Sequence, residues 1–353
     1  MKKISLILIA LILVLSLPAK DFSSELNRTA YIPTSMTFRA MGESGRAIAL
    51  PEDGFSVNPA ALASDGFELI LPSFEAAVTN VNALLNSDIK GVLNKDTTAM
   101  MDMLSLLSGS SYFIDGKISS SLIIKGFGVS FSLKSGLYTS GESISAYVTV
   151  PIEGVLSLGY AHEFDLNNSY KLSIGGVLHT NLRYYIKPVD VTTFVDVATG
   201  DEKLDLSFIK ESNLTLDLGA TLKMPYGFSS ALTIDHITLK NLKGNLKYDL
   251  SLSTSLGWSY KYGPLRLSLA MDLVDITRIQ INNALYHLNL GGYIGLWNNL
   301  GLYGGLKGGY PSFGLKLKLL FMESYITYTI NEYSEFVGYN PKDTLSFSFR
   351  LFF

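Results

Sequence analysis

Cysteine is missing from this sequence of 353 residues, and tryptophan nearly so, with 2 residues against 20 tyrosines and 19 phenylalanines. Without cysteine the protein has no disulfide and cannot be a lipoprotein anchored through an N-terminal cysteine. Only four histidines are present, and they are dispersed, so we expect neither a structural metal site nor a cofactor. A catalytic triad needs a serine and a carboxylate that converge on one of them, and nothing local in the sequence resembles such a site, so we do not expect an enzyme. The histidines are His162, His179, His236 and His287.

A long apolar run is present only at the N-terminus. Residues 4–17 follow Lys2 and Lys3, precede Leu17-Pro18-Ala19, and are shorter than the ~20 residues that a membrane-spanning helix needs. We therefore expect residues 1–19 to be a cleaved signal peptide rather than a membrane anchor. Cleavage removes two of 28 basic residues against 31 acidic ones, which leaves a net charge of about −5. This charge argues against nucleic acid as a partner.

Apolar residues nevertheless make up 47% of the chain, and they are spread by alternation. In residues 213–223 one face of a strand would carry Leu214, Leu216, Leu218, Ala220 and Leu222, with polar residues on the other. A soluble sandwich also alternates, but its strands average about 5–6 residues. Here they run to about ten or more, which matches the ~9–11 that cross a bilayer. Because an open sheet edge is not tolerated in lipid, the sequence predicts an all-β fold, a transmembrane antiparallel β-barrel.

We expect about fourteen strands, an even number as in other single-chain bacterial barrels. The predicted strands are residues 67–78, 117–125, 127–138, 144–160, 170–185, 213–224, 228–239, 248–261, 265–274, 286–296, 300–308, 313–321, 324–330 and 344–353. Tight turns, such as 165–169 and 225–227, alternate with longer polar loops, such as 188–212 and 240–247, and this places the tight turns in the periplasm and the long loops outside. The alternation holds only if residues 144–160 form one over-long strand of constant parity with a kink, although Pro151 and Gly154 invite a turn.

Residues 36–63 do not follow this alternation and are rich in small residues. The turn at Asn58-Pro59 is fixed, because proline locks its own φ and restricts the residue before it. The run Arg39-Ala40-Met41-Gly42, followed by Gly45, Asp53 and Asn58-Pro59-Ala60, resembles the N-terminal hatch of the FadL family of outer-membrane channels for hydrophobic compounds, and of the related PorV-like proteins. Ser44 and Ala61 stand where the family pattern has glycine.

The resemblance implies a domain organisation for the whole chain. It comprises a signal peptide (1–19), an N-terminal hatch in the lumen (20–65) and the barrel (66–353), with an extracellular helical loop at 81–109. The hatch residues that the resemblance implies are Arg39, Met41, Gly42, Gly45, Arg46, Asp53, Asn58 and Pro59.

Within residues 81–109, apolar residues recur at helical spacing and predict two short amphipathic helices outside the barrel. Their apolar face either packs on the barrel rim or, as the resemblance implies, forms a groove through which a hydrophobic substrate enters. The candidate groove residues are Leu85, Ile89, Val92, Met100, Met103, Leu104 and Leu107.

Several charged residues have the parity of the lumen. They either pair with one another across the interior, or a subset binds an anionic head group such as a fatty carboxylate. The candidate luminal cations are Lys134, Arg183, Lys223, Arg266, Lys316 and Arg350, and acidic residues of the same parity include Glu163, Asp217, Asp249 and Asp272.

Together with the resemblance, these features predict an outer-membrane channel through which hydrophobic small molecules, such as long-chain fatty acids, diffuse. The alternative is a PorV-like outer-membrane scaffold or surface-protein carrier without transport activity. We expect a monomer that reaches the periplasm through its signal peptide. Its expected partners are the outer-membrane assembly machinery, outer-membrane lipid and a hydrophobic substrate.

Overall fold

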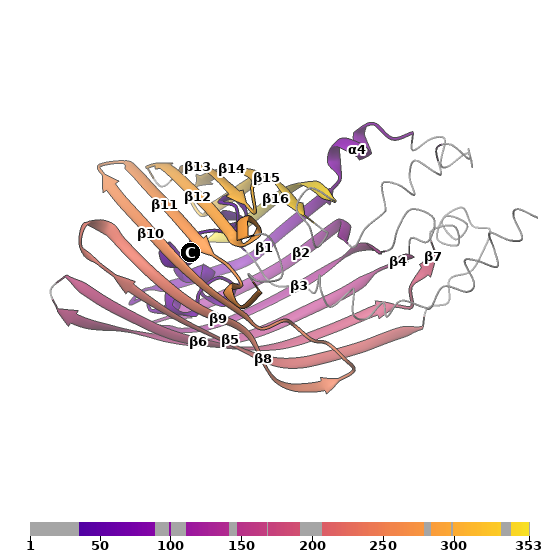
Figure 1. The fold of residues 1–353 in the computed structure, drawn as a ribbon, viewed down its shortest axis with the longest axis horizontal. Coiled ribbons are helices and arrows are strands. Elements are labelled where there is room, and N and C mark those ends of the chain that lie inside the picture. Colours follow the sequence, from indigo (N-terminus) through magenta and orange to yellow (C-terminus); the bar gives the residue numbers. More distant parts are fainter. Residues whose placement is uncertain are drawn as a thin grey trace, which may run out of the picture.

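The computed structural model describes residues 35–88, 99, 111–140, 147–167, 169–190, 207–278, 284–297, 299–332 and 340–352. Fourteen long antiparallel strands form a closed barrel (Figure 1). Each pairs with the next along the chain, and the first, β1, also pairs with the last, β16. The long strands are β1 (Phe67–Thr79), β2 (Ser111–Ile124), β3 (Phe127–Ser140), β5 (Pro151–Asn167), β6 (Tyr170–Ile186), β8 (Phe208–Lys223), β9 (Phe228–Lys243), β10 (Ser251–Tyr262), β11 (Leu265–Leu273), β12 (Leu288–Leu296), β13 (Leu300–Lys307), β14 (Tyr310–Leu319), β15 (Met322–Glu332) and β16 (Pro341–Phe352). The predicted fold class is therefore confirmed.

The remaining elements are short. Two short strands, β4 (Tyr147–Thr149) and β7 (Val189–Asp190), extend the sheet beyond β3. The helices are α3 (Met36–Ala40), η1 (Arg46–Ile48), η2 (Pro51–Phe55), η3 (Pro59–Leu62), α4 (Val81–Leu85), η4 (Pro225–Gly227), η5 (Ile276–Arg278) and η6 (Ala284–His287). None of the described helices has the length and apolarity needed to span a membrane.

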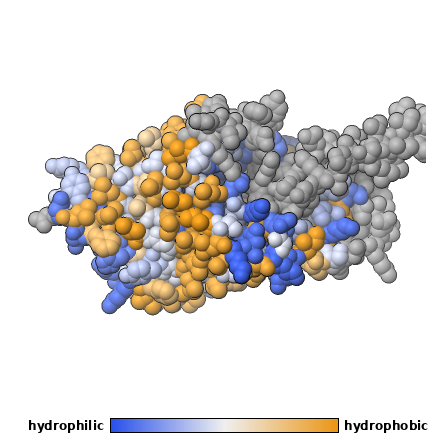
Figure 2. Space-filling view, turned by 60° about the horizontal axis from the view of Figure 1, so that its bottom comes forward, coloured by the Kyte–Doolittle hydropathy of each residue, from blue (hydrophilic) through white to orange (hydrophobic). Residues whose placement is uncertain are grey.

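Alternation along the strands separates an apolar outer face from a polar inner face. On β5, for example, Leu156 and Leu158 are exposed, whereas Val155 and Ser157 are buried. Across the molecule the exposed apolar side chains form a band with hydrophilic surface on either side, as Figure 2 shows for one face. This band has the form expected of a surface in contact with lipid.

Of the segment predicted as one strand at 144–160, residues 147–160 are described, and they contain no turn, as that choice expects. β4 and β5 pair with β3 in one continuous register, since Thr149 lies opposite Tyr138 and Ile152 opposite Ser135. The strand is interrupted between Thr149 and Pro151, and the continuous register keeps the expected parity across this interruption.

At the end of the barrel opposite the tight turns, the strands run further than expected. β8 begins at Phe208 and β9 continues to Lys243, so the predicted loops 188–212 and 240–247 are too long. At the turn end, β5 continues to Asn167, inside the predicted turn 165–169. At the start of β8, the adjacent exposed residues Phe208 and Ile209 break the alternation, so it does not predict that end. At the end of β5, Phe164 and Leu166 continue the exposed apolar face into the predicted turn.

The first described residues fold inside the barrel. Helices α3, η1, η2 and η3 lie within the ring of strands (Figure 1), and most of their side chains are buried. The four helices together contact strands on every side of the barrel, from β5, β6 and β8 to β13 and β15. We call residues 35–64 the hatch from here on.

Candidate functional site

The hatch follows the inner wall of the barrel, and wall glycines make room for it. A Cβ atom added to any of eight glycines would lie within 3 Å of a hatch atom. These wall glycines are Gly128, Gly159, Gly175, Gly219, Gly257, Gly291, Gly305 and Gly314, on β3, β5, β6, β8, β10, β12, β13 and β14. From β5 to β14 they contact hatch residues of falling number, from Leu62 at Gly159 to Ala40 at Gly314, while Gly128 on β3 contacts Phe55. The hatch thus forms an arc around most of the wall.

The backbone of the hatch comes closest to the backbone of the wall at Met41 and Gly42. Gly42 has φ +68°, and a Cβ atom there would lie 2.7 Å from the backbone nitrogen of Leu306. On the other side, a Cβ atom on Gly305 would lie 2.3 Å from the carbonyl carbon of Met41. Glycine is required on both partners because the two backbones are in contact.

Asp272 of β11 anchors the middle of the hatch. Its carboxylate accepts hydrogen bonds from the backbone nitrogens of Gly45 (3.0 Å) and Arg46 (3.2 Å). The Arg46 guanidinium lies 3.1 Å from the same carboxylate, and Ser255 of β10 donates to it while accepting from Ala47 N. A buried carboxylate satisfied by three donors and a cation is a strong attachment.

Asn58 anchors the end of the hatch. Its Nδ2 donates to the carbonyl oxygen of Arg46 and to the hydroxyl of Thr221 on β8, both at 2.8 Å. Its Oδ1 accepts from Ala60 N at 3.0 Å and so caps η3, which begins with Pro59. The side chain is fully buried, and it joins the end of the hatch to its middle and to the wall.

Asp53 acts within the hatch rather than against the wall. Its Oδ2 accepts from Leu50 N at 3.0 Å, and its backbone carbonyl accepts from Ser56 and Val57. Burial, and after it the carboxylate of Glu52, raise the pKa of Asp53 to about 6. The hatch therefore holds a carboxyl group that titrates close to neutral pH.

Ion pairs join the hatch to the wall at three further points. Glu43 contacts Lys307 of β13 at 2.7 Å, and Glu52 contacts Arg350 of β16 at 2.7 Å. Arg39 pairs with Glu75 of β1, which also accepts from Lys117 of β2 at 2.8 Å. Glu43, Glu52 and Glu75 were not among the predicted site residues, because a lone glutamate in an alternating strand or a polar segment carries no distinguishing signal.

Most of the predicted luminal cations already have acidic partners. Lys134 pairs with Asp115, Arg183 with Glu211, Lys223 with Glu163, and both Lys316 and Arg350 with Glu323. Arg266 has no ion pair among the described residues within 4.0 Å. Of the two alternatives, these contacts favour mutual pairing over a free cationic site for a carboxylate.

A serine and a carboxylate do converge on one histidine, from strands that are separated in the sequence, so a search for local grouping could not find them. Across β5, β6 and β8, Ser157 Oγ lies 2.8 Å from His179 Nδ1, and His179 Nε2 lies 3.1 Å from Asp217. Asp217 also accepts from the backbone nitrogen of His236. The Ser157 hydroxyl is only 2% exposed and has no room for a substrate, so the cluster joins neighbouring strands. Within the described part of the chain, no cluster of three acidic or histidine residues could hold a metal ion.

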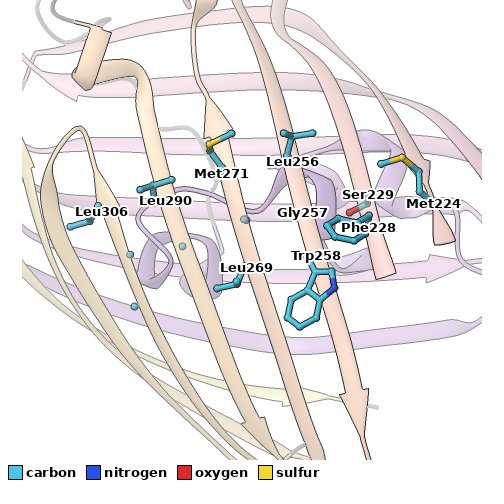
Figure 3. A pocket seen from close by; sticks show the side chains of 14 residues that line it. Met224, Phe228, Ser229, Leu256, Gly257, Trp258, Leu269, Met271, Leu290 and Leu306 are labelled. Carbon is cyan, nitrogen blue, oxygen red and sulfur yellow. The ribbon is translucent and has the colours of Figure 1, made fainter. Parts of the chain in front are cut away.

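A large apolar groove lies on the outer face of β9 to β13, directly behind the hatch. It has a volume of about 610 Å³, and Phe228, Leu256, Trp258, Met271 and Leu290 line it (Figure 3). Its floor is the thin wall at Gly257, Gly291 and Gly305, whose inner side contacts the hatch. The groove and the hatch are therefore separated by little more than backbone.

This groove is not the one predicted at 81–109. Of the predicted groove residues only Leu85 lies in the described part of the chain, on α4, where it is 78% exposed. The other six, Ile89, Val92, Met100, Met103, Leu104 and Leu107, lie outside the described residues.

Comparison with known proteins finds similarity in structure alone. No protein-family model and no curated protein sequence matches the chain. The chain is similar to the Ralstonia pickettii toluene transporter TbuX, with a TM-score of 0.51 and 10% identity over 92% of this chain and 99% of that one. A TodX deltaS2S3 mutant monoaromatic hydrocarbon channel gives 0.52 and 10% over 89% and 97%. A Pseudomonas aeruginosa FadL homologue gives 0.46 and 11% over 91% and 98%. The FadL-like fold expected from residues 36–63 is therefore confirmed.

Proposed function

We propose that the protein is an outer-membrane channel for hydrophobic small molecules, in which the hatch closes the lumen. The observation that carries this proposal is the attachment of the hatch, which follows the wall from β3 to β14 and is held there by polar contacts. Neutral hydrogen bonds contribute about 0.5–1.5 kcal/mol each and those to charged groups about 1.5–3 kcal/mol, so the hatch is held by several contacts that water can replace one by one. A lumen closed in this way suits a channel that opens transiently.

The apolar groove on β9 to β13 supports a hydrophobic substrate. Its volume of about 610 Å³ is within the roughly 300–1,000 Å³ of small-molecule sites. The structural neighbours include a toluene transporter and a monoaromatic hydrocarbon channel, and we extend that class of substrate to this chain. Long-chain fatty acids are a second class to test.

An outer-membrane location is supported by the apolar outer surface of the barrel and by the proposed signal peptide. The apolar band suits a bilayer, and a signal peptide at residues 1–19 would deliver the chain to the periplasm. The assembly machinery would then insert the barrel into the outer membrane as a monomer, with lipid around it.

An uptake panel in proteoliposomes tests this function. Labelled monoaromatic hydrocarbons and fatty acids should enter vesicles that hold the protein faster than protein-free vesicles. Met271→Trp fills the groove and should slow the uptake of aromatic compounds. Ile326→Trp is the matched control, because Ile326 is equally exposed on the outer face of β15 but lies away from the groove. Absence of any uptake, with co-purification of a secreted protein, would instead favour the scaffold alternative.

A further inference from the structure

The hatch meets the remaining quarter of the wall, from β15 to β2, without wall glycines. β15, β16 and β1 contain no glycine, and the hatch is held there by side chains: Arg39 pairs with Glu75 of β1, and Glu52 with Arg350 of β16. Between the hatch and this part of the wall lies a cleft of about 100 Å³. Along β2 it runs from Lys117 to Ser121, a length of ~13 Å at the usual rise per residue of a strand.

This cleft is lined mainly by hydroxyl groups, and we call it the hydroxyl cleft. The serines of the wall that line it are Ser73, Ser119, Ser120, Ser121, Ser130, Ser132 and Ser348. Ser119 lies opposite Ser132, and Ser121 opposite Ser130, in the pairing of β2 with β3. These direct pairs place two rungs of hydroxyls along the cleft.

The wall hydroxyls of the cleft have no partner in the described part of the chain. Ser73, Ser132 and Ser348 are at least nine-tenths buried, yet none makes a side-chain hydrogen bond to another described residue. Their hydroxyl oxygens are not among the fully buried side-chain atoms that lack a partner, and all three serines line the cleft. The hydroxyls therefore open into the cleft, where a molecule from outside the chain can bond them. The cleft is polar and large enough for several water molecules.

The charges at the cleft neutralise one another. Glu75 is paired with both Arg39 and Lys117, and Arg350 with both Glu52 and Glu323. Paired ions present no strong field of one sign, so the cleft offers no particular attraction to a free ion. Neutral molecules that donate and accept hydrogen bonds fit its lining best.

We propose that the hydroxyl cleft is a polar passage, which holds a chain of water molecules and carries small uncharged polyols past the seated hatch. This passage is separate from the route of hydrophobic compounds proposed above. It lies on β1, β2, β3, β15 and β16, whereas the apolar groove lies on β9 to β13. A linear polyol can satisfy the serine hydroxyls in turn along its length, as water does.

A cysteine placed in the cleft tests the passage, since the chain has no cysteine of its own. Ser121→Cys is introduced, and the assembled protein is labelled with a small water-soluble methanethiosulfonate reagent, so that folding precedes the block. The readout is the swelling rate of proteoliposomes in erythritol, a linear polyol, and in sucrose, which is too bulky for the cleft. The control is Ser268→Cys, a luminal position on β11 outside the cleft.

We expect unlabelled protein to swell in erythritol and not in sucrose, and labelling of Ser121→Cys to reduce the rate to that of protein-free liposomes. Labelled Ser268→Cys should keep the wild-type rate. The proposal is overturned if wild type does not swell in erythritol, if sucrose enters equally fast, if Ser121→Cys does not react, or if its labelling leaves swelling unchanged. Hydrocarbon uptake by vesicles that hold the wild-type protein is measured separately. If no such uptake is observed, that result counts against the proposed function and leaves the polar passage untouched.

Discussion

At the scale of single residues, a few buried polar side chains determine where the hatch lies. Asp272 satisfies two backbone nitrogens of the hatch and one guanidinium, and Asn58 satisfies one carbonyl, one hydroxyl and one backbone nitrogen. Sequence reasoning found both positions, because Asn58 belongs to the hatch motif and Asp272 has luminal parity. It could not pair Asp272 with the hatch, since the two are more than 200 residues apart and alternation gives no distances.

Asn58→Ala should loosen the hatch. The substitution leaves the Arg46 carbonyl, the Thr221 hydroxyl and the Ala60 nitrogen without their partner, at about 1–3 kcal/mol for each buried group left unpaired. In planar bilayers we expect a leak conductance above that of wild type. Asn86→Ala, which removes a side-chain hydrogen bond on the exposed end of α4, should conduct as wild type does. An Asn58→Ala channel as tight as wild type would show that Asn58 is not a clamp.

Asp53 should make the hatch sensitive to pH. Because burial and Glu52 raise its pKa from 3.8 to about 6 in the seated hatch, the seated form binds the proton more tightly than an exposed segment does. The stabilisation from this group is therefore complete below about pH 4 and is lost as the pH rises to about 6. The leak conductance of wild type should exceed that of Asp53→Asn increasingly over this interval. Parallel pH profiles of the two proteins would contradict this assignment.

At the scale of elements, alternation located all fourteen strands but not their ends. The predicted starts of β1, β3, β6, β9, β11 and β13 agree with the structure, because an apolar face begins there against lipid. At the ends of β8 and β9 the period of two disappears, because Phe208 and Ile209 of β8 are adjacent and both exposed, and Leu242 of β9 stands alone among polar residues. Alternation also assigns Gly219, Gly257 and Gly291 to the luminal face of their strands. Their contact with the hatch could not be predicted, because it depends on the three-dimensional path of the hatch, which no local pattern encodes.

Adjacent residues of β11 provide a test of the two faces. Leu269 lies midway along the strand and is 59% exposed on the outer face, whereas its neighbour Ser268 points to the lumen. Leu269→Arg should destabilise the inserted barrel by ~2–4 kcal/mol, as a cation near the bilayer midplane does, and Ser268→Arg should cost much less. Urea titration of the folded barrel in liposomes measures both. Equal tolerance at the two positions would mean that β11 does not face lipid.

At the scale of the whole molecule, orientation and closure are linked. The tight turns between β5 and β6, β8 and β9, and β10 and β11 lie at one end of the barrel and the long connections at the other, where Gly308 and Gly309 form a further tight turn between β13 and β14 (Figure 1). The hatch lies inside the barrel between these two ends. The fold class and the presence of a hatch were both predictable, the first from alternation and the second from a family motif. The hydroxyl cleft was not, because it depends on where the arc of the hatch stops.

Thiol labelling of intact cells tests the orientation. Tyr226 is 90% exposed in a tight turn, and Lys247 is exposed at the other end of the barrel. A membrane-impermeant reagent should label Lys247→Cys and spare Tyr226→Cys until the outer membrane is permeabilised. Labelling of Tyr226→Cys in intact cells would reverse the assigned orientation.

Deletion of residues 36–63 tests most directly whether the hatch closes the lumen. Each of the fourteen long strands pairs with two others independently of the hatch, so the deleted protein should still assemble into a heat-modifiable barrel. In planar bilayers, its single-channel conductance should be far above that of wild type, whose only open path would be the narrow hydroxyl cleft. An assembled deletion protein with the conductance of wild type would contradict the account, because the lumen would then be closed by something other than the hatch.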